Sequence, residues 1–155
     1  MTQTSASELL AGMSNPLSIH ARQQFLAEPH VAIVSIPRGH DEAPLCAPVW
    51  YSYAPGSELW WITPKPSRKG KLLRVGMPLS FTVMAGPGSA RYVSVQGAIV
   101  ALDEPTTDGH QRPLAQRYLG ETVGAKYADT MTPYNSYSYL IRVRPTHWLS
   151  GDLTS

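Results

Sequence analysis

Residues 60–74, WWITPKPSRKGKLLR, place an aromatic stretch directly before a strongly basic one. The aromatic part is typical of a β-strand, and Ser67 is a typical helix N-cap residue. Five of the chain's 13 Lys+Arg lie between positions 65 and 74, and no Asp or Glu occurs from 59 to 102. Unbalanced cations at a helix N-terminus favour an anion, with phosphate as the leading candidate. A solvated basic helix face gives the same pattern, so the residues alone leave both interpretations open.

Length and composition indicate one globular domain with part of its surface covered. A chain of 155 residues fits a single domain, and 43% hydrophobic residues are enough for a core. The charged fraction of 15% is low for a fully solvated surface, which favours burial against another subunit or a ligand. A net charge of +2 is too small to imply nucleic acid, and no segment is long and apolar enough to span a bilayer. Neither nucleic acid nor a membrane is therefore an expected partner.

The single cysteine and the N-terminus bear on location. Cys46 has no intrachain disulfide partner, which fits a reducing compartment, and we expect it to be a small buried residue. Residues 1–14 lack the basic and apolar regions of a signal peptide. We therefore expect a cytoplasmic protein with a flexible segment at 1–14 and a single domain at 15–155.

Hydrophobic periodicity predicts a mainly β protein with helical caps. Asn15-Pro16 marks the start of a helix that ends before Pro29. Turns at 54–57 and 86–89 are typical of hairpins. Strands are expected at 31–36, 45–53, 58–63, 79–85, 90–102 and 137–144, with further helices at 69–75, 113–118 and 123–129. Six strands in hairpin-connected order favour a six-stranded antiparallel β-barrel.

Two strands carry positional detail. In the strand at 90–102, Tyr92, Ser94 and Gln96 alternate with valines and should face the opposite side. Pro48 interrupts the strand at 45–53, which requires an edge, a bulge or a break in pairing. Unpaired backbone at that point would suit a flat polar ligand, and an ordinary edge strand explains the proline equally well.

Known catalytic motifs are missing from the sequence. The five histidines are scattered without a metal-ligand spacing, so no metal site is expected. There is no nucleophile elbow, no Walker loop and no obvious carboxylate pair. The catalytic residues are therefore unknown, and this pattern favours a protein whose cofactor performs the chemistry.

The order of several motifs resembles the pyridoxamine 5'-phosphate oxidase-like FMN-binding split-barrel family. The resemblance covers roughly residues 21–152. The matching pieces are Ala47-Pro48-Val49-Trp50-Tyr51, Leu59-Trp60-Trp61-Ile62-Thr63, Ser67-Arg68-Lys69, Arg91-Tyr92-Val93-Ser94-Val95-Gln96-Gly97, Arg117-Tyr118-Leu119-Gly120 and Arg142-Val143-Arg144-Pro145-Thr146-His147-Trp148.

The resemblance implies a split β-barrel of the FMN-binding type that forms a homodimer with the cofactor at the interface. By analogy, phosphate would be held by Thr63, Ser67, Arg68 and Lys69. The strand Pro48, Val49, Trp50 and Tyr51 would lie along the flavin ring, partly through backbone groups. Arg91, Tyr92 and Trp148 complete the expected cofactor-binding set, with Trp148 near the cofactor of the partner subunit or acting as a packing anchor.

The activity implied by this resemblance is an FMN-dependent oxidoreductase acting on an unidentified small molecule. Tyr92 stands where the true oxidase has a glutamine, and the chain stops soon after Trp148, so pyridoxamine phosphate is not the expected substrate. One alternative is a reductase that uses the deazaflavin coenzyme F-420, with Lys65, Lys71 and Arg74 along its polyglutamate tail. Another is a non-catalytic protein that binds flavin or haem.

Overall fold

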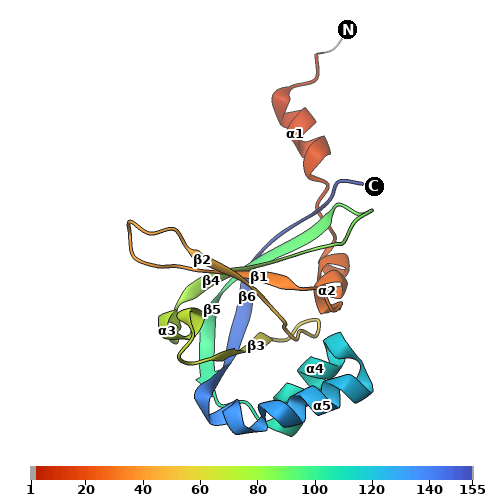
Figure 1. The fold of residues 1–155 in the computed structure, drawn as a ribbon. Coiled ribbons are helices and arrows are strands. Elements are labelled where there is room, and N and C mark those ends of the chain that lie inside the picture. Colours follow the sequence, from red (N-terminus) through yellow and green to blue (C-terminus); the bar gives the residue numbers. More distant parts are fainter. Residues whose placement is uncertain (1–2, 155) are drawn as a thin grey trace.

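A six-stranded antiparallel sheet forms the centre of the protein. The computed structural model describes residues 3–154, apart from the side chains of residues 11–14. The sheet order is β2-β1-β4-β5-β6-β3, and it curls into a half-barrel with helices around it (Figure 1). The strands are β1 Ala32–Ile36, β2 Leu45–Val49, β3 Leu59–Pro64, β4 Pro78–Met84, β5 Arg91–Asp103 and β6 Ser138–Asp152. The expected mainly β split barrel is confirmed.

Among the described residues, the segment that follows edge strand β2 meets the other edge strand, β3, at a single bridge. Ser52 and Trp60 form an isolated bridge whose two N–H···O distances are 2.9 and 3.0 Å. The turn at 54–57 is present, but it does not join a regular hairpin, because β3 forms its ladder with β6. The barrel is therefore split along most of the β2–β3 boundary and closed by one bridge.

Alternating side chains fill the interior of the barrel. Val93 and Val95 are 0% and 1% exposed, whereas Tyr92, Ser94 and Gln96 point outward, as the period of two predicts. The largest fully buried side chains include Trp61, Tyr51, Phe25 and Phe81. Two register shifts in the long β5–β6 ladder bend these strands, as β-bulges do.

Five α-helices and two short helical turns surround the sheet. They are α1 Ala6–Ser14, α2 Ile19–Ala27, α3 Arg68–Leu72, η1 Thr107–Gln111, α4 Arg112–Leu119, α5 Glu121–Met131 and η2 Thr132–Tyr137. Helix α1 projects away from the sheet (Figure 1). It begins with a capping box between Ser5 and Glu8, although no helix was expected in this segment. The division of the chain after residue 14 stays a prediction.

Several boundaries differ from those expected. Helix α2 begins after the N-cap Ser18, whose side chain accepts a hydrogen bond from Ala21, and not at Asn15-Pro16. Strand β2 ends at Val49 because the chain then leaves β1 and crosses toward β3. Strand β6 continues to Asp152, since β5 is long enough to pair with it throughout.

Cys46 is exposed, which corrects the expectation of a buried residue. It lies on the edge strand β2, where alternate side chains face outward. Among the helices of residues 3–154, none is both long and apolar enough to cross a membrane.

Candidate functional site

A cavity of about 420 Å³ lies where the split of the barrel meets the α4–α5 helical hairpin. The strand side contributes Pro48, Val49, Trp50 and Thr63, and the helical side is lined by Gln111, Leu114, Ala115, Tyr127 and Met131. This volume falls within the range of about 300–1,000 Å³ that is usual for small-molecule sites. The split therefore provides room for a cofactor-sized ligand.

The cavity has a polar wall and an aromatic wall. Thr63, Lys69 and Ser138 line the polar wall, where the end of β3 pairs with the start of β6. Trp50 and Tyr127 line the aromatic wall, with ring centroids 5.8 Å apart. A ligand with an anionic end and a flat apolar body matches this division.

Helix α3 brings the basic segment to the polar wall. Ser67 is the N-cap, since its hydroxyl accepts a hydrogen bond from the Gly70 N–H at 3.0 Å. The same hydroxyl donates to the Pro64 carbonyl at 2.7 Å, so it ties α3 to the end of β3. Lys69 lines the cavity, whereas Arg68 is exposed on the same helix outside the lining. The structure therefore gathers Thr63, Ser67, Arg68 and Lys69 within one short region.

Gly70 is a residue that sequence reasoning missed. A Cβ at this position would lie 2.2 Å from the Pro64 carbonyl oxygen and 2.5 Å from that of Lys65. Only glycine allows α3 to lie this close to the β3 turn. Its signal in the sequence is a glycine in the middle of a helical segment, where its low helix propensity calls for a packing reason.

The cations of residues 65–74 have no carboxylate partner among the described residues. Every ion pair of residues 3–154 joins groups elsewhere, such as Arg142 with Glu58 and Arg112 with Asp129. Lys65 instead donates to the Ser136 carbonyl at 3.2 Å. The positive potential of this segment is therefore not neutralised within the described chain and favours an anion.

Three of the four residues predicted beside a flavin ring line the cavity, namely Pro48, Val49 and Trp50. Tyr51 does not, because its side chain is fully buried in the core. Its hydroxyl donates to the Leu26 carbonyl at 2.6 Å, and burial raises the pKa of Tyr51. The Tyr51 N–H donates to the hydroxyl of Tyr118 at 3.1 Å. This backbone N–H, which has no strand partner, is therefore satisfied by a side chain.

Arg91, Tyr92 and Trp148 do not line this cavity. Arg91 lies over the ring of Phe25, 5.1 Å from its centroid, and Tyr92 is on the outward side of β5. Trp148 lines a separate hollow of about 170 Å³ and carries the Arg22 guanidinium 4.7 Å from its ring centroid. One chain therefore does not bring these three residues to the same cavity as Lys69.

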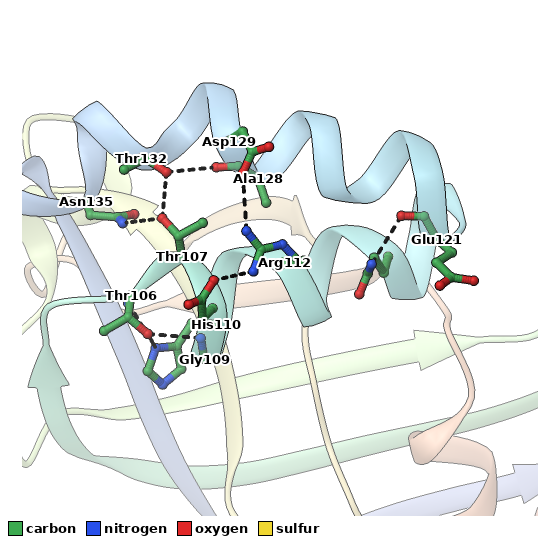
Figure 2. A network of polar contacts seen from close by, with 12 residues as sticks. Thr106, Thr107, Gly109, His110, Arg112, Glu121, Ala128, Asp129, Thr132 and Asn135 are labelled. Carbon is green, nitrogen blue, oxygen red and sulfur yellow. Dashed lines mark hydrogen bonds and ion pairs between the residues drawn. The ribbon is translucent and has the colours of Figure 1, made fainter.

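A polar network joins the helical elements that cover the cavity (Figure 2). Arg112 pairs with Asp108 in η1 and with Asp129 in α5, the latter at 3.2 Å. Thr107 hydrogen-bonds to Thr132 at 2.6 Å and accepts from Asn135 at 3.1 Å. These contacts hold η1, α4, α5 and η2 together as one unit.

His110 belongs to the same network. Its Nδ1 accepts a hydrogen bond from the Thr106 N–H at 3.0 Å (Figure 2). The centroid of its ring lies 5.4 Å from that of Trp60. Burial lowers the pKa of His110, which favours the neutral ring that this hydrogen bond requires. The hydrogen bond and the ring contact therefore give His110 a structural role in η1.

The described cavity lining includes no His, Cys, Asp or Glu. Across residues 3–154, no three such side chains are grouped closely enough to hold a metal ion. The lining can bind, orient and shield a ligand, and redox chemistry here would have to come from a bound group.

No protein-family model and no curated protein matches the sequence. Solved structures do match. A conserved hypothetical protein of Mycobacterium tuberculosis aligns with a TM-score of 0.72 and 21% identity over 99% of this chain and 91% of that chain.

Two named proteins align less closely. An F420 reductase matches with a TM-score of 0.56 and 18% identity over 81% of this chain and 94% of its own. A candidate pyridoxamine 5'-phosphate oxidase of Corynebacterium glutamicum matches with a TM-score of 0.56 and 15% identity over 88% of this chain and 90% of its own. The chain thus has the split-barrel fold of the pyridoxamine 5'-phosphate oxidase-like proteins, as the resemblance in its sequence implied.

Proposed function

We propose that this protein binds FMN in the cavity at the split of the barrel and acts as an FMN-dependent oxidoreductase on a small molecule. The observation that carries the proposal is the pairing of a polar wall that includes Lys69 with an aromatic wall in a cavity of about 420 Å³. The resemblance of the sequence and the fold shared with flavin-related proteins support the same conclusion.

The residues present fit a flavin mononucleotide. Lys69 and Thr63 on the polar wall would hold the phosphate. Arg68 would add positive charge from outside the cavity lining, and Ser67 would cap helix α3. Pro48, Val49 and Trp50, which also line the cavity, would lie along the ring. This assignment leaves the buried Tyr51 out of the cofactor contacts.

When bound, the flavin would supply two-electron hydride transfer. The residues of the chain would hold the phosphate, fix the plane of the ring and exclude water beneath the α4–α5 cover. No His, Cys, Asp or Glu lines the described cavity, and Lys69 is assigned to the phosphate, so proton transfer by a cavity side chain is not part of the proposal.

Flavin binding is tested first by the visible spectrum of the purified protein and the mass of its heat-released chromophore. A two-band flavin spectrum with FMN released would support the proposal. Calorimetric titration of cofactor-free protein with FMN should then compare the wild type with an Arg68→Ala/Lys69→Ala variant. Removing two charge-assisted contacts should weaken binding by at least about tenfold.

Lys126→Ala is the matched control for this titration, because Lys126 is exposed on α5 and does not line the cavity. Unchanged affinity in the double variant would refute the phosphate assignment. Failure of the wild type to bind FMN or a deazaflavin would remove the proposed function and leave the fold standing.

A homodimer is part of the same proposal, and the outward side of the sheet supports it. On β6 the exposed Arg144, paired with Ala98, lies on that side too, and beyond it a neutral face carries no Lys, Arg, Asp or Glu across five neighbouring strands. It consists of Ile33, Ser35, Cys46, Pro48, Ser80, Thr82, Met84, Tyr92, Ser94, Gln96, His147 and Leu149. Ile33, Met84 and Leu149 on it are 45%, 70% and 64% exposed, as suits a surface covered by a second subunit.

The neutral face reaches the cavity, since Pro48 belongs to both. A second copy on this face would approach the cavity with residues of its own, and Tyr92 lies on the same face. This arrangement would give Tyr92 a cofactor role across the interface that one chain does not provide. A cofactor role for Arg91 and Trp148 stays a prediction, because neither belongs to the neutral face.

The dimer is tested by light scattering coupled to gel filtration. The wild type should elute with twice the chain mass of 17.0 kDa. Ile33→Glu places a charge in the neutral face and should yield the single-chain mass, whereas Val75→Glu, at an exposed position outside the face, should not. A monomeric wild type would refute this part of the proposal.

A deazaflavin of the coenzyme F-420 type is the second candidate cofactor. Lys65 before α3, Lys71 within it and Arg74 after it extend the positive charge, and none has a carboxylate partner among the described residues, as an acidic tail would need. A single violet absorption band and release of a tailed deazaflavin would favour it over FMN.

A non-catalytic binding role is the remaining alternative. Haem fits less well than a flavin, because the described lining offers no His or Cys as an axial ligand and leaves Met131 and Tyr127 from the usual set. A bound flavin with no turnover across a panel of reductants and acceptors would favour a storage role.

A cytoplasmic location belongs to the proposal as well, since a free exposed Cys46 suits a reducing compartment.

A further inference from the structure

The Trp50 part of the aromatic wall belongs to a segment that is in no strand. Strand β2 ends at Val49, and the chain pairs again only at the Ser52–Trp60 bridge. Trp50 and Tyr51 are the residues that cross between the two edges of the sheet. Their backbone groups have no ladder partner, so something else must satisfy and fix them.

The Tyr118 hydroxyl from α4 supplies that partner. It accepts a hydrogen bond from the Tyr51 N–H at 3.1 Å and lies 3.2 Å from the Tyr51 carbonyl oxygen. It donates to the His30 carbonyl at 2.7 Å. One side chain therefore connects the crossing segment to the residues that precede β1.

The ring of Tyr118 also fixes the plane of Trp50. The two rings stack with centroids 5.0 Å apart and planes 7° from parallel. Trp50 lines the cavity and Tyr118 does not, so Tyr118 lies behind the wall. Stacking and hydrogen bonding together restrain both the backbone and the side chain of the wall.

The neighbouring residue anchors Tyr118 itself. The Arg117 guanidinium donates to the Ala27 and Glu28 carbonyl oxygens, both at 2.7 Å, where helix α2 ends. Helix C-termini have unsatisfied carbonyl groups and favour cations, so this contact is favourable on both counts. Arg117 thereby holds α4 against α2 and directs Tyr118 at the crossing segment.

We infer that Tyr118 is a positioning residue: it acts as a substitute strand partner for Tyr51 and sets the plane of Trp50 as the ring-facing wall of the cavity. The inference rests on the proposed function for the identity of the ligand, and it deepens that function by assigning a role to a residue that does not touch the ligand.

The central variant is Tyr118→Phe, which keeps the stacked ring and removes the hydroxyl. Hydrogen exchange followed by NMR should show the Tyr51 amide exchanging about fivefold faster than in the wild type, as expected for the loss of one hydrogen bond. Saturating FMN should bind with a shifted visible spectrum, because the wall against the ring has moved. Tyr134→Phe, at an exposed tyrosine outside the cavity lining, is the matched control and should match the wild type in both readouts.

Two further variants separate positioning from simple loss of stability or affinity. Lys69→Ala should weaken FMN binding and leave the spectrum of the saturated complex unchanged. Trp50→Phe keeps the Tyr118 hydroxyl, so Tyr51 exchange should stay as in the wild type while the FMN spectrum shifts. Trp50→Phe also tests the wall if Tyr118→Phe fails to fold.

Unchanged exchange at Tyr51 in Tyr118→Phe would overturn the inference, and so would an unchanged FMN spectrum in either aromatic variant. If the wild type binds no flavin, the proposed function fails separately. The inference is then decided in the cofactor-free protein by Tyr51 exchange and by the near-ultraviolet circular dichroism of Trp50. Identical dichroism in the wild type and Tyr118→Phe would overturn it.

Discussion

Replacing Gly70 with alanine should displace helix α3 and weaken binding of an anion at the cavity. The new Cβ would lie 2.2 Å from the Pro64 carbonyl oxygen, whereas ordinary carbon–oxygen contacts are about 3.3 Å or longer. The separation must therefore grow by about 1 Å, and both obstructing oxygens belong to the backbone. Overpacking of this kind costs about 1–3 kcal/mol.

Thermal unfolding and FMN titration measure the two consequences of Gly70→Ala. For a chain of this size, each kcal/mol lowers Tm by about 2–4 °C, so a fall of roughly 2–12 °C is expected. FMN affinity should fall at least about fivefold, because Lys69 moves with α3 and charge-assisted contacts depend strongly on geometry.

Gly39→Ala is the control for this prediction. A Cβ at Gly39 would meet no atom within 4 Å, so this change should be neutral or stabilise by up to about 1 kcal/mol. If Gly70→Ala behaved like Gly39→Ala in both assays, the close approach of α3 to β3 would not matter, and the reasoning would be refuted.

Two further predictions concern the helical cover. Gly124→Ala would place a Cβ 2.5 Å from the Gln116 backbone and should force α4 and α5 apart, lowering the free energy of unfolding by about 1–3 kcal/mol in a denaturant titration; an unchanged midpoint would contradict it. His110 has a lowered pKa in the folded state, so its contribution to stability is complete above its ordinary pKa of about 6.5 and declines as pH falls through the lowered value. His110→Gln should flatten that part of the stability profile below about pH 6.5, and an equally steep profile in the variant would show that another group is responsible.

Local patterns in the sequence predict much of the sheet and the capping of α3. The alternation around Val93 and Val95 gives the correct faces because a strand has a strict period of two. Ser67 is recognisable as a cap from its chemistry alone. The basic run of α3 and the cavity-lining Pro48 and Trp50 likewise follow from residue type and motif order.

Contacts between distant residues explain what could not be predicted. Tyr51 continues the aromatic pattern of its neighbours, yet its side chain is buried and its N–H meets Tyr118, which lies 67 residues further along the chain. Gly70 is required by two carbonyl oxygens whose position depends on the turn after β3. No local period encodes either contact.

The single Ser52–Trp60 bridge has a consequence for solubility as well as for ligand binding. Along the rest of the split, β2 and β3 are edge strands, and such strands can template intermolecular pairing and aggregation. Pro48 lacks an N–H to donate on β2, which weakens that strand as a template. Loss of the bridge would therefore widen the split between β2 and β3. It would also expose edge backbone groups that can pair with strands of other molecules.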